Sequence, residues 1–142
     1  MNGPDTMWSN WDKKDGVIAF DIDDVLIDNH SCTEGCDYTY YPRDYDKLKR
    51  MKCPINNRVK ELINELKDRG FHIILWTSRI EEEREVTEKY LNDRGVLFDE
   101  LIMDKPRALL YVDDRAFRFD GDVDALKEKI EEVVRNDTEH KA

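Results

Sequence analysis

"GVIAFDIDDVLID", residues 16–28, decides the fold, because an apolar run ends there in three aspartates within four positions. A continuously apolar run is typical of a strand in a parallel sheet that is covered on both faces. The like charges of Asp21, Asp23 and Asp24 repel one another, and their burial is costly unless something positive compensates. We therefore expect a buried first strand over residues 16–22 with a positive group near its end.

Apolar runs and amphipathic segments alternate along the rest of the chain. We predict further strands over 71–76, 100–103 and 108–112, and helices over about 55–69, over 80–94 and from Asp122 onwards. The side chains expected to face the core in these helices are Val59, Leu62, Ile63 and Leu66, then Val86, Tyr90 and Leu91, then Val123, Leu126, Ile130, Val133 and Val134. This alternation predicts an α/β protein: a three-layer, doubly wound parallel sheet with right-handed crossovers and helices on both faces.

The 142 residues are enough for one domain with a single core. We place this domain at residues 16–136, between an N-terminal arm (1–15) and a C-terminal tail (137–142). Residues 29–54 show no clean period and hold four tyrosines and two prolines, so we interpret them as a short insertion after the first strand.

The net charge of −10 argues against an extended surface for duplex nucleic acid. Residues 41–60 nevertheless hold seven Lys or Arg against two Asp, a local excess of five positive charges that could steer an anionic substrate or simply be a solvated helix start. No apolar stretch approaches the ~20 residues of a membrane helix, so no membrane partner is expected. The N-terminal residues show no apolar signal-peptide core, so we expect a cytoplasmic protein.

Polar side chains follow every predicted strand. They are Asp21 and Asp23, then Thr77, Ser78 and Arg79, then Asp104 and Lys105, then Asp113 and Asp114. In parallel α/β sheets, ligands bind beyond the carboxyl ends of the strands. Carboxylates suit a hard cation such as Mg²⁺, which also accepts phosphate oxygens. A divalent cation would offset the repulsion among the aspartates, provided that the first and fourth strands lie side by side.

This ordered set resembles the haloacid dehalogenase superfamily of phosphohydrolases: Asp-x-Asp after the first strand, Thr/Ser after the second, a Lys, and Asp-Asp after the fourth. The likeness covers about residues 16–136. It implies a Mg²⁺-dependent phosphatase in which Asp21 attacks the phosphorus and forms an aspartyl-phosphate. Asp23 would protonate the leaving oxygen, then deprotonate the hydrolytic water.

The resemblance also implies roles for the other strand ends. Lys105 would stabilise the nucleophile and the phosphoryl charge. The residues expected to contact the substrate are Thr77, Ser78 and Arg79. The residues expected to hold the metal are Asp21, Asp23 through its backbone carbonyl, Asp113 and Asp114.

The position of the second aspartate narrows the reaction. An acidic residue two positions after the nucleophile favours phosphatases and phosphomutases, and residues 29–54 are too short for a mutase's cap domain. A small open site with Arg and Tyr near its rim is similar to the 3′-phosphatase domain of polynucleotide kinases. The predicted partner is thus a small phosphorylated substrate, with a nucleotide or a nucleic-acid end as options. A non-catalytic binding protein on the same scaffold is the alternative of another class.

The cysteines leave two interpretations. His30, Cys32, Cys36 and Cys53 could form a closed tetrahedral site for a structural Zn²⁺. The alternative is that the cysteines are small buried hydrophobic residues. Their odd number, without a signal peptide, does not suggest a disulfide framework.

Overall fold

A computed structural model describes residues 16–28 and 53–141 of the chain, with side chains up to residue 136. The expected arm (1–15) and residues 29–52 of the insertion lie outside this part. The chain divides into two compact units, Met1–Pro106 and Arg107–Ala142, and each is described by itself.

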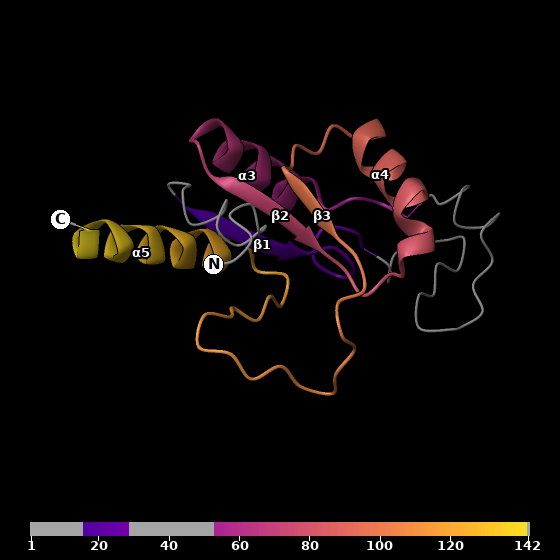
Figure 1. The fold of residues 1–142 in the computed structure, drawn as a ribbon. Helices are drawn as coiled ribbons and strands as arrows, with labels where there is room; N and C mark the ends of the chain where they lie inside the picture. Colours follow the sequence, from indigo (N-terminus) through magenta and orange to yellow (C-terminus); the bar gives the residue numbers. More distant parts are fainter. Residues whose placement is uncertain (1–15, 29–52, 142) are drawn as a thin grey trace, which may run out of the picture. The chain divides into compact units, whose positions relative to one another are not determined.

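The first unit contains a parallel sheet of three strands, β1 (Val17–Asp21), β2 (His72–Trp76) and β3 (Glu100–Ile102), in that spatial order (Figure 1). β2 lies in the centre, and the register places Asp21 opposite Trp76. All three strands end at the same edge of the sheet because they run parallel. The sheet confirms the predicted α/β class and the first three predicted strands.

The helix between β1 and β2, α3 (Asn57–Asp68), lies within the predicted range of about 55–69. Asn56 caps it, since its Oδ1 accepts a hydrogen bond of 3.1 Å from the Val59 amide. Its apolar stripe is buried as predicted, and consists of Val59, Leu62, Ile63 and Leu66. Gly70 follows the helix with φ of +97°, a conformation that glycine adopts without strain.

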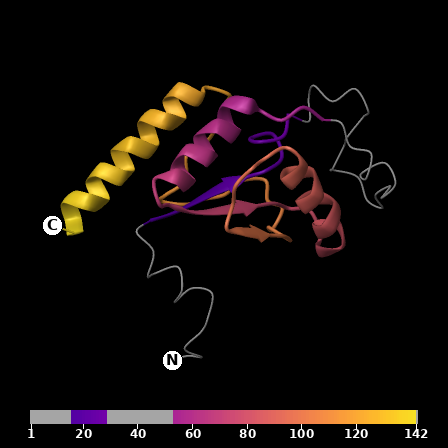
Figure 2. The same ribbon diagram turned by 90° about the horizontal axis from the view of Figure 1, so that it is seen from above.

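The connection between β2 and β3 starts with a 3₁₀ turn (Glu81–Glu83) and continues as α4 (Arg84–Asp93). Tyr90 and Leu91 are buried there as predicted, whereas Val86 is half-buried. Figure 1 shows α3 and α4 on the same side of the sheet, as right-handed crossovers between neighbouring strands require, and Figure 2 shows the same elements from that side.

The core of the first unit lies between this face of the sheet and the two helices. Phe20, Ile73, Leu75 and Leu101 come from the strands and are at most 6% exposed. Each fully buried aliphatic or aromatic side chain of this size contributes roughly 1.5–3 kcal/mol to folding. This core fixes the strand ends relative to one another, which is what the site requires.

The second unit contains α5 (Val123–Lys141), which Asp122 caps through a 3.0 Å hydrogen bond from the Ala125 amide, as predicted. Val123, Leu126 and Ile130 are buried, but Val133 is 52% exposed, so the prediction that Val133 faces the core is wrong. No helix in the part of the chain seen in the structure is long and apolar enough to cross a membrane.

The predicted fourth strand, 108–112, is wrong in this structure: residues 107–122 form neither helix nor strand. Leu109 and Val112 are more than nine-tenths exposed. An apolar run supplies strand propensity only, and a strand also needs a neighbour that satisfies its backbone hydrogen bonds. No such neighbour pairs with it among the residues that the structure covers.

Candidate active site

Asp21 and Asp23 stand at the end of β1 on a loop that apolar side chains anchor. Ile22, Leu26 and Ile27 are fully buried, and the Ile22 carbonyl accepts hydrogen bonds from the backbone amides of Leu26 and Ile27 (both 2.9 Å). The apolar residues that continue after the aspartates therefore hold the loop down. Asp21 and Asp23 stay partly exposed at the strand end.

Lys105 approaches Asp21 from the loop after β3. Its Nζ lies 3.6 Å from Asp21 Oδ2 and 4.8 Å from the ring centre of Trp76, while its backbone amide donates to the Thr77 carbonyl at 2.8 Å. Burial raises the pKa of Asp21 above its ordinary value; the charge of Lys105 opposes this shift and Asp23 adds to it. An additional cation near Asp21 would favour the carboxylate that a nucleophile must present.

Asp23 is held by two neighbours from the end of β2 and the loop that follows. Arg79 donates from Nη2 to Asp23 Oδ1 at 2.8 Å and from Nε to Oδ2 at 3.2 Å, and Thr77 donates from Oγ1 to Oδ2 at 3.1 Å. The Arg79 side chain is only 1% exposed, against 20% for that of Asp23. The structure thus brings Asp21, Asp23, Thr77 and Lys105 together, as the sequence predicted.

Arg79 does not lie open to a ligand as a predicted substrate contact would. Besides Asp23, its guanidinium donates from Nη1 to Thr87 Oγ1 on α4 at 3.1 Å, and Thr87 is itself fully buried. Thr87 is a member of the site that reasoning from the sequence missed. In the sequence, Thr87 is one polar residue among the charged residues of a helix, and no local pattern predicts its contact with Arg79.

Neither Thr77 nor Ser78 caps the helix after β2, because the N-cap positions of the 3₁₀ turn and of α4 are Ile80 and Glu83. The Thr77 hydroxyl accepts from the Arg79 amide at 3.1 Å, so it closes a turn before the helix begins. At the start of the 3₁₀ turn, Glu83 Oε1 accepts a hydrogen bond from the Ile80 amide at 3.3 Å. Thr77 is fully buried and Ser78 is half-buried beside it.

Asp113 and Asp114 belong to the second unit, where both are exposed. Asp113 Oδ1 accepts from the Arg115 amide at 2.8 Å, which orients its carboxylate within the loop. Within the described ranges 16–28 and 53–141, no group of three or more His, Cys, Asp or Glu side chains forms a ready metal site. The proposed Mg²⁺ donors are all oxygens, which is the donor set that Mg²⁺ prefers.

The predicted zinc site has no support. Cys53 is in a disulfide, so it cannot supply a thiolate to a zinc ion, and it is not simply a small buried hydrophobic residue. His30, Cys32 and Cys36 lie outside the described residues. The Cys53 carbonyl also accepts a hydrogen bond from the Tyr90 hydroxyl, which links the end of the insertion to α4.

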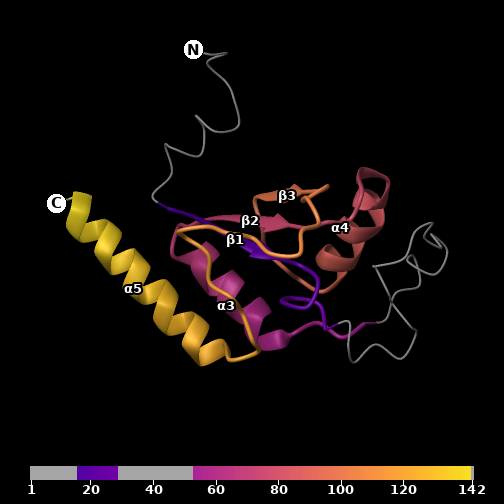
Figure 3. The ribbon, with the colours of Figure 1, turned by 90° about the horizontal axis from the view of Figure 1, so that it is seen from below.

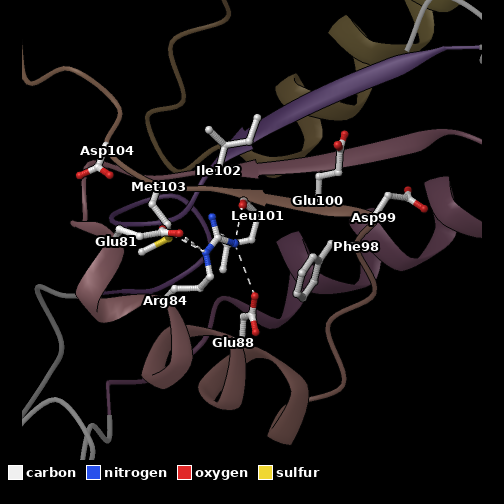
Figure 4. A pocket seen from close by; sticks show the side chains of 10 residues that line it. All are labelled: Glu81, Arg84, Glu88, Phe98, Asp99, Glu100, Leu101, Ile102, Met103 and Asp104. Atoms are coloured by element: carbon white, nitrogen blue, oxygen red, sulfur yellow. Dashed lines mark hydrogen bonds and ion pairs between the residues drawn. The ribbon is translucent and has the colours of Figure 1, made fainter. Parts of the chain in front are cut away.

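An open depression of about 540 Å³ lies beside β3 and α4 (Figure 4). Five of its ten lining residues are acidic, and its arginine, Arg84, is held by Glu81, Glu88 and the Leu101 carbonyl. A phosphate group would meet mostly like charge there. The three strands, which Figure 3 shows side by side from below, instead end together at the edge of the sheet where β1 ends in Asp21. We therefore place the candidate active site at the strand ends around Asp21, not in this depression.

The fold and the residues at the strand ends define a Rossmann-like α/β protein with a site at the carboxyl edge of its sheet. A profile of the HAD superfamily, subfamily IIIB (acid phosphatase), matches residues 4–114. The chain belongs to this family, and it is a phosphatase that hydrolyses phosphoric monoesters. No match was found among curated protein sequences.

Two solved structures are similar to the chain. A crystal structure of a structural-genomics target from Vibrio cholerae is 19% identical, with a TM-score of 0.51, and the match covers 72% of this chain and 83% of that one. A chain in the structure of a Pnkp1/Rnl/Hen1 complex is 22% identical, with a TM-score of 0.48, over 68% of this chain and 30% of that one. At these identities the first likeness supports the fold alone.

Proposed function

We propose that the chain is a Mg²⁺-dependent phosphatase that hydrolyses a phosphomonoester through an aspartyl-phosphate on Asp21. The observation that carries the proposal is the ammonium of Lys105, 3.6 Å from Asp21 Oδ2, at the same strand end where Asp23 is fixed. A nucleophilic carboxylate next to a neutralising cation and a second carboxyl group contains the elements that a two-step phosphoryl transfer needs.

In the first step, an Asp21 oxygen forms a bond to phosphorus while the bond from phosphorus to the leaving oxygen breaks. The carboxyl group of Asp23 gives its proton to that oxygen, so the product leaves as an alcohol. Lys105 stabilises the negative charge shared between Asp21 and the phosphoryl oxygens. Positioned acid–base catalysis of this kind is typically worth about 10²–10⁴-fold in rate.

In the second step, the Asp23 carboxylate takes a proton from a water molecule whose oxygen attacks the phosphorus. The Asp21–phosphorus bond breaks, which releases inorganic phosphate and restores both residues. Ser78 and the backbone around Thr77 are the groups we assign to the phosphoryl oxygens. The Thr77 hydroxyl is committed to Asp23, so its contribution is to place that residue.

Asp21, the backbone carbonyl of Asp23, Asp113 and Asp114 are the residues we assign to Mg²⁺. The ion would neutralise charge on the transferred group and offset the repulsion between Asp21 and Asp23.

The test is hydrolysis of an aryl phosphate with Mg²⁺ by the wild type and by Asp21→Asn. We expect turnover by the wild type only, and mass spectrometry of acid-quenched wild type should detect one added phosphoryl group on the peptide that contains Asp21. Undiminished turnover by Asp21→Asn would exclude this nucleophile. A folded wild type that hydrolyses none of many phosphomonoesters would instead favour a binding protein on this scaffold.

The substrate class that we propose is a phosphorylated nucleotide, with the terminal phosphate of DNA or RNA as the alternative. The excess of basic residues over 41–60 in an acidic chain supports an anionic substrate. The two options differ in how kcat/KM depends on length. A mononucleotide should match an oligonucleotide in kcat/KM under the first option, and the oligonucleotide should be clearly better under the second.

The cytoplasmic location expected from the sequence stays a proposal. Disulfides are rare in cytosolic proteins, and the disulfide at Cys53 counts against this location. Thiol labelling of the protein in its native cells, before lysis, would test it. A labelled Cys53 supports the cytosol, whereas an unlabelled Cys53 that becomes reactive only after reduction supports an oxidising compartment.

A further inference from the structure

Arg79 carries a buried positive charge at the centre of the candidate active site, and the reaction above gives it no task. We propose that Arg79 is a positioning residue: its two-point hydrogen bond holds the Asp23 carboxyl group where it can reach the leaving oxygen, and Thr87 holds Arg79 in place. This inference rests on the proposed function.

The geometry of the contact fixes orientation as well as position. Arg79 binds the two oxygens of Asp23 through different nitrogens, Nη2 to Oδ1 at 2.8 Å and Nε to Oδ2 at 3.2 Å. A planar guanidinium that binds a carboxylate at two points restricts the rotation of the carboxylate as well as its distance. A single ammonium, as in lysine, would fix the distance alone.

The surroundings of Arg79 argue against direct contact with substrate. Its side chain is 1% exposed, so the guanidinium faces Asp23 and Thr87 from within the protein. The backbone around Arg79 is also fixed, because its amide donates to Thr77 Oγ1 and its carbonyl accepts from the Asp104 amide at 2.8 Å. A buried charge held in this way is costly to move, which suits a fixed support for another side chain.

Thr87 extends the support to α4. Its hydroxyl accepts from Arg79 Nη1 at 3.1 Å, and Thr87 is fully buried. Replacing it with valine keeps the volume but leaves one buried N–H of Arg79 without this acceptor. We therefore expect Thr87→Val to loosen Arg79 without removing its charge, and Thr87→Ser to restore the hydrogen bond.

The role proposed for Arg79 affects one event of the first step, the transfer of a proton to the leaving oxygen. While the Asp21–phosphorus bond forms and the bond to the leaving oxygen breaks, protonated Asp23 gives its proton to that oxygen, and Arg79 binds at two points the carboxylate that remains. An alkyl alcohol leaves poorly without this proton, whereas a nitrophenolate leaves well without it. A displacement of about 1 Å in a catalytic group can cost about 10²-fold in rate. Loss of Arg79 should therefore slow alkyl esters much more than nitrophenyl esters.

The experiment measures kcat and KM for 4-nitrophenyl phosphate and for a simple alkyl phosphate with Mg²⁺, using the wild type, Arg79→Gln, Arg79→Lys and Thr87→Val. We expect kcat on the alkyl ester to fall about 10²-fold in Arg79→Gln, with less than a tenth of that loss on the nitrophenyl ester. Arg79→Lys and Thr87→Val should show the same selectivity to a smaller degree, and Thr87→Ser should recover most of the alkyl activity. KM should change little throughout.

Arg84→Gln is the matched control, because Arg84 forms its hydrogen bonds to Glu81, Glu88 and the Leu101 carbonyl, away from Asp23. It should leave both activities unchanged. Thermal unfolding of each variant separates positioning from loss of fold, and Thr87→Val keeps the test valid if Arg79→Gln does not fold.

Equal losses on both esters would overturn the proposal, and so would a rise in KM without a change in selectivity, since the latter is the behaviour of a substrate contact. These outcomes differ from failure of the proposed function, in which the wild type itself would hydrolyse neither ester.

Discussion

The ammonium of Lys105 lies 3.6 Å from Oδ2 of Asp21, although β2 and β3 both lie between the two residues in the sequence. The approach depends on the backbone: the Lys105 amide donates to the Thr77 carbonyl, which docks the loop after β3 against the end of β2. The ring of Trp76 then lies 4.8 Å from Nζ.

This contact predicts the effect of removing the charge. Lys105→Ala should lower kcat for an aryl phosphate by about 10²–10³-fold, the typical cost of losing one electrostatic stabiliser of a transition state. The loss should be similar for alkyl and nitrophenyl esters, unlike the loss expected for Arg79→Gln. Lys89→Ala is the control, since Lys89 pairs with Asp93 on the exposed side of α4. A Lys105→Ala variant with wild-type kcat would remove Lys105 from the mechanism.

We expect the charged side chain of Asp21 to lower the stability of the folded protein, although the proposed reaction needs it. Burial and Asp23 raise the pKa of Asp21, so the folded protein disfavours the charged form that exists at neutral pH. We expect Asp21→Asn to raise Tm in metal-free buffer at pH 7, measured by calorimetry. Added Mg²⁺ should then stabilise the wild type but not the variant.

Glu61→Gln, an exposed position on α3, is the control for the loss of one negative charge. If Asp21→Asn and Glu61→Gln change Tm by the same amount, the effect comes from the net charge of the protein, and burial of the charged Asp21 side chain does not lower stability.

The elements of the first unit could be predicted because each depends on local chemistry. The apolar stripe and Asn cap of α3, and the glycine that follows it, all act within a few residues. The segment 108–112 shows the limit of this reasoning. Its apolar residues favour a strand, but whether a strand forms depends on a hydrogen-bonding neighbour from elsewhere in the chain, and a local pattern does not contain that information.

The residues of the candidate site also divide into those that the sequence predicts and those that depend on contacts between distant parts of the chain. Asp21, Asp23 and Lys105 could be predicted because each comes at the end of a strand, and parallel strands bring their ends together. The role of Arg79 could not, because it depends on burial and on a hydroxyl one turn into α4. From the sequence, an arginine beside a phosphate motif looked like a ligand of the phosphate.

Asp24 gives a prediction about the loop that carries the nucleophile. Its φ is +66°, and the sequence offered no role for it. In this left-handed conformation most L-residues are strained by roughly 1–2 kcal/mol, whereas Gly is not and Asp and Asn are tolerated. We expect Asp24→Ala to lower the free energy of unfolding by about 1 kcal/mol relative to Asp24→Gly, measured by urea denaturation. Asp24→Asn should lie near the wild type, and equal stabilities of the Ala and Gly variants would contradict a positive φ.

The hydrogen bonds of Asp99 allow a prediction of how the stability of the folded protein depends on pH. Burial alone would raise its pKa, but hydrogen bonds from Lys67 (2.6 Å) and from the Ile73 amide (2.7 Å) outweigh burial and hold the pKa of Asp99 below its ordinary value of 3.8. The folded state therefore favours the carboxylate. This contribution is complete above pH 3.8 and is lost as the pH falls through the lower pKa of the folded state.

We expect the wild type to be more stable than Asp99→Asn at neutral pH, and this advantage to shrink below about pH 4. Urea denaturation at a series of pH values measures it. Asp93→Asn, which removes an exposed ion pair on α4, should change stability by less than about 1 kcal/mol. An advantage of the wild type over Asp99→Asn that stayed constant down to pH 2 would show that the hydrogen bonds do not distinguish the two charge states of Asp99.

Asp113 tests whether the two units share one metal. The proposed function assigns Asp113 and Asp21 to one Mg²⁺ ion. Loss of partners around metal ligands typically costs 10–100-fold in affinity, so Asp113→Ala should raise the Mg²⁺ concentration for half-maximal activity by at least about tenfold.

Isothermal titration of Mg²⁺ supplies the readout that does not depend on turnover. Asp113→Ala and Asp21→Asn should each weaken binding, whereas Glu128→Gln, exposed on α5 in the same unit as Asp113, should not. Because a shared ion couples its ligands, the double variant should bind hardly more weakly than the worse single variant. If the two losses simply add, or if Asp113→Ala binds Mg²⁺ like the wild type, then Asp21 and Asp113 do not hold one ion, and the metal at the end of β1 draws its remaining ligands from elsewhere.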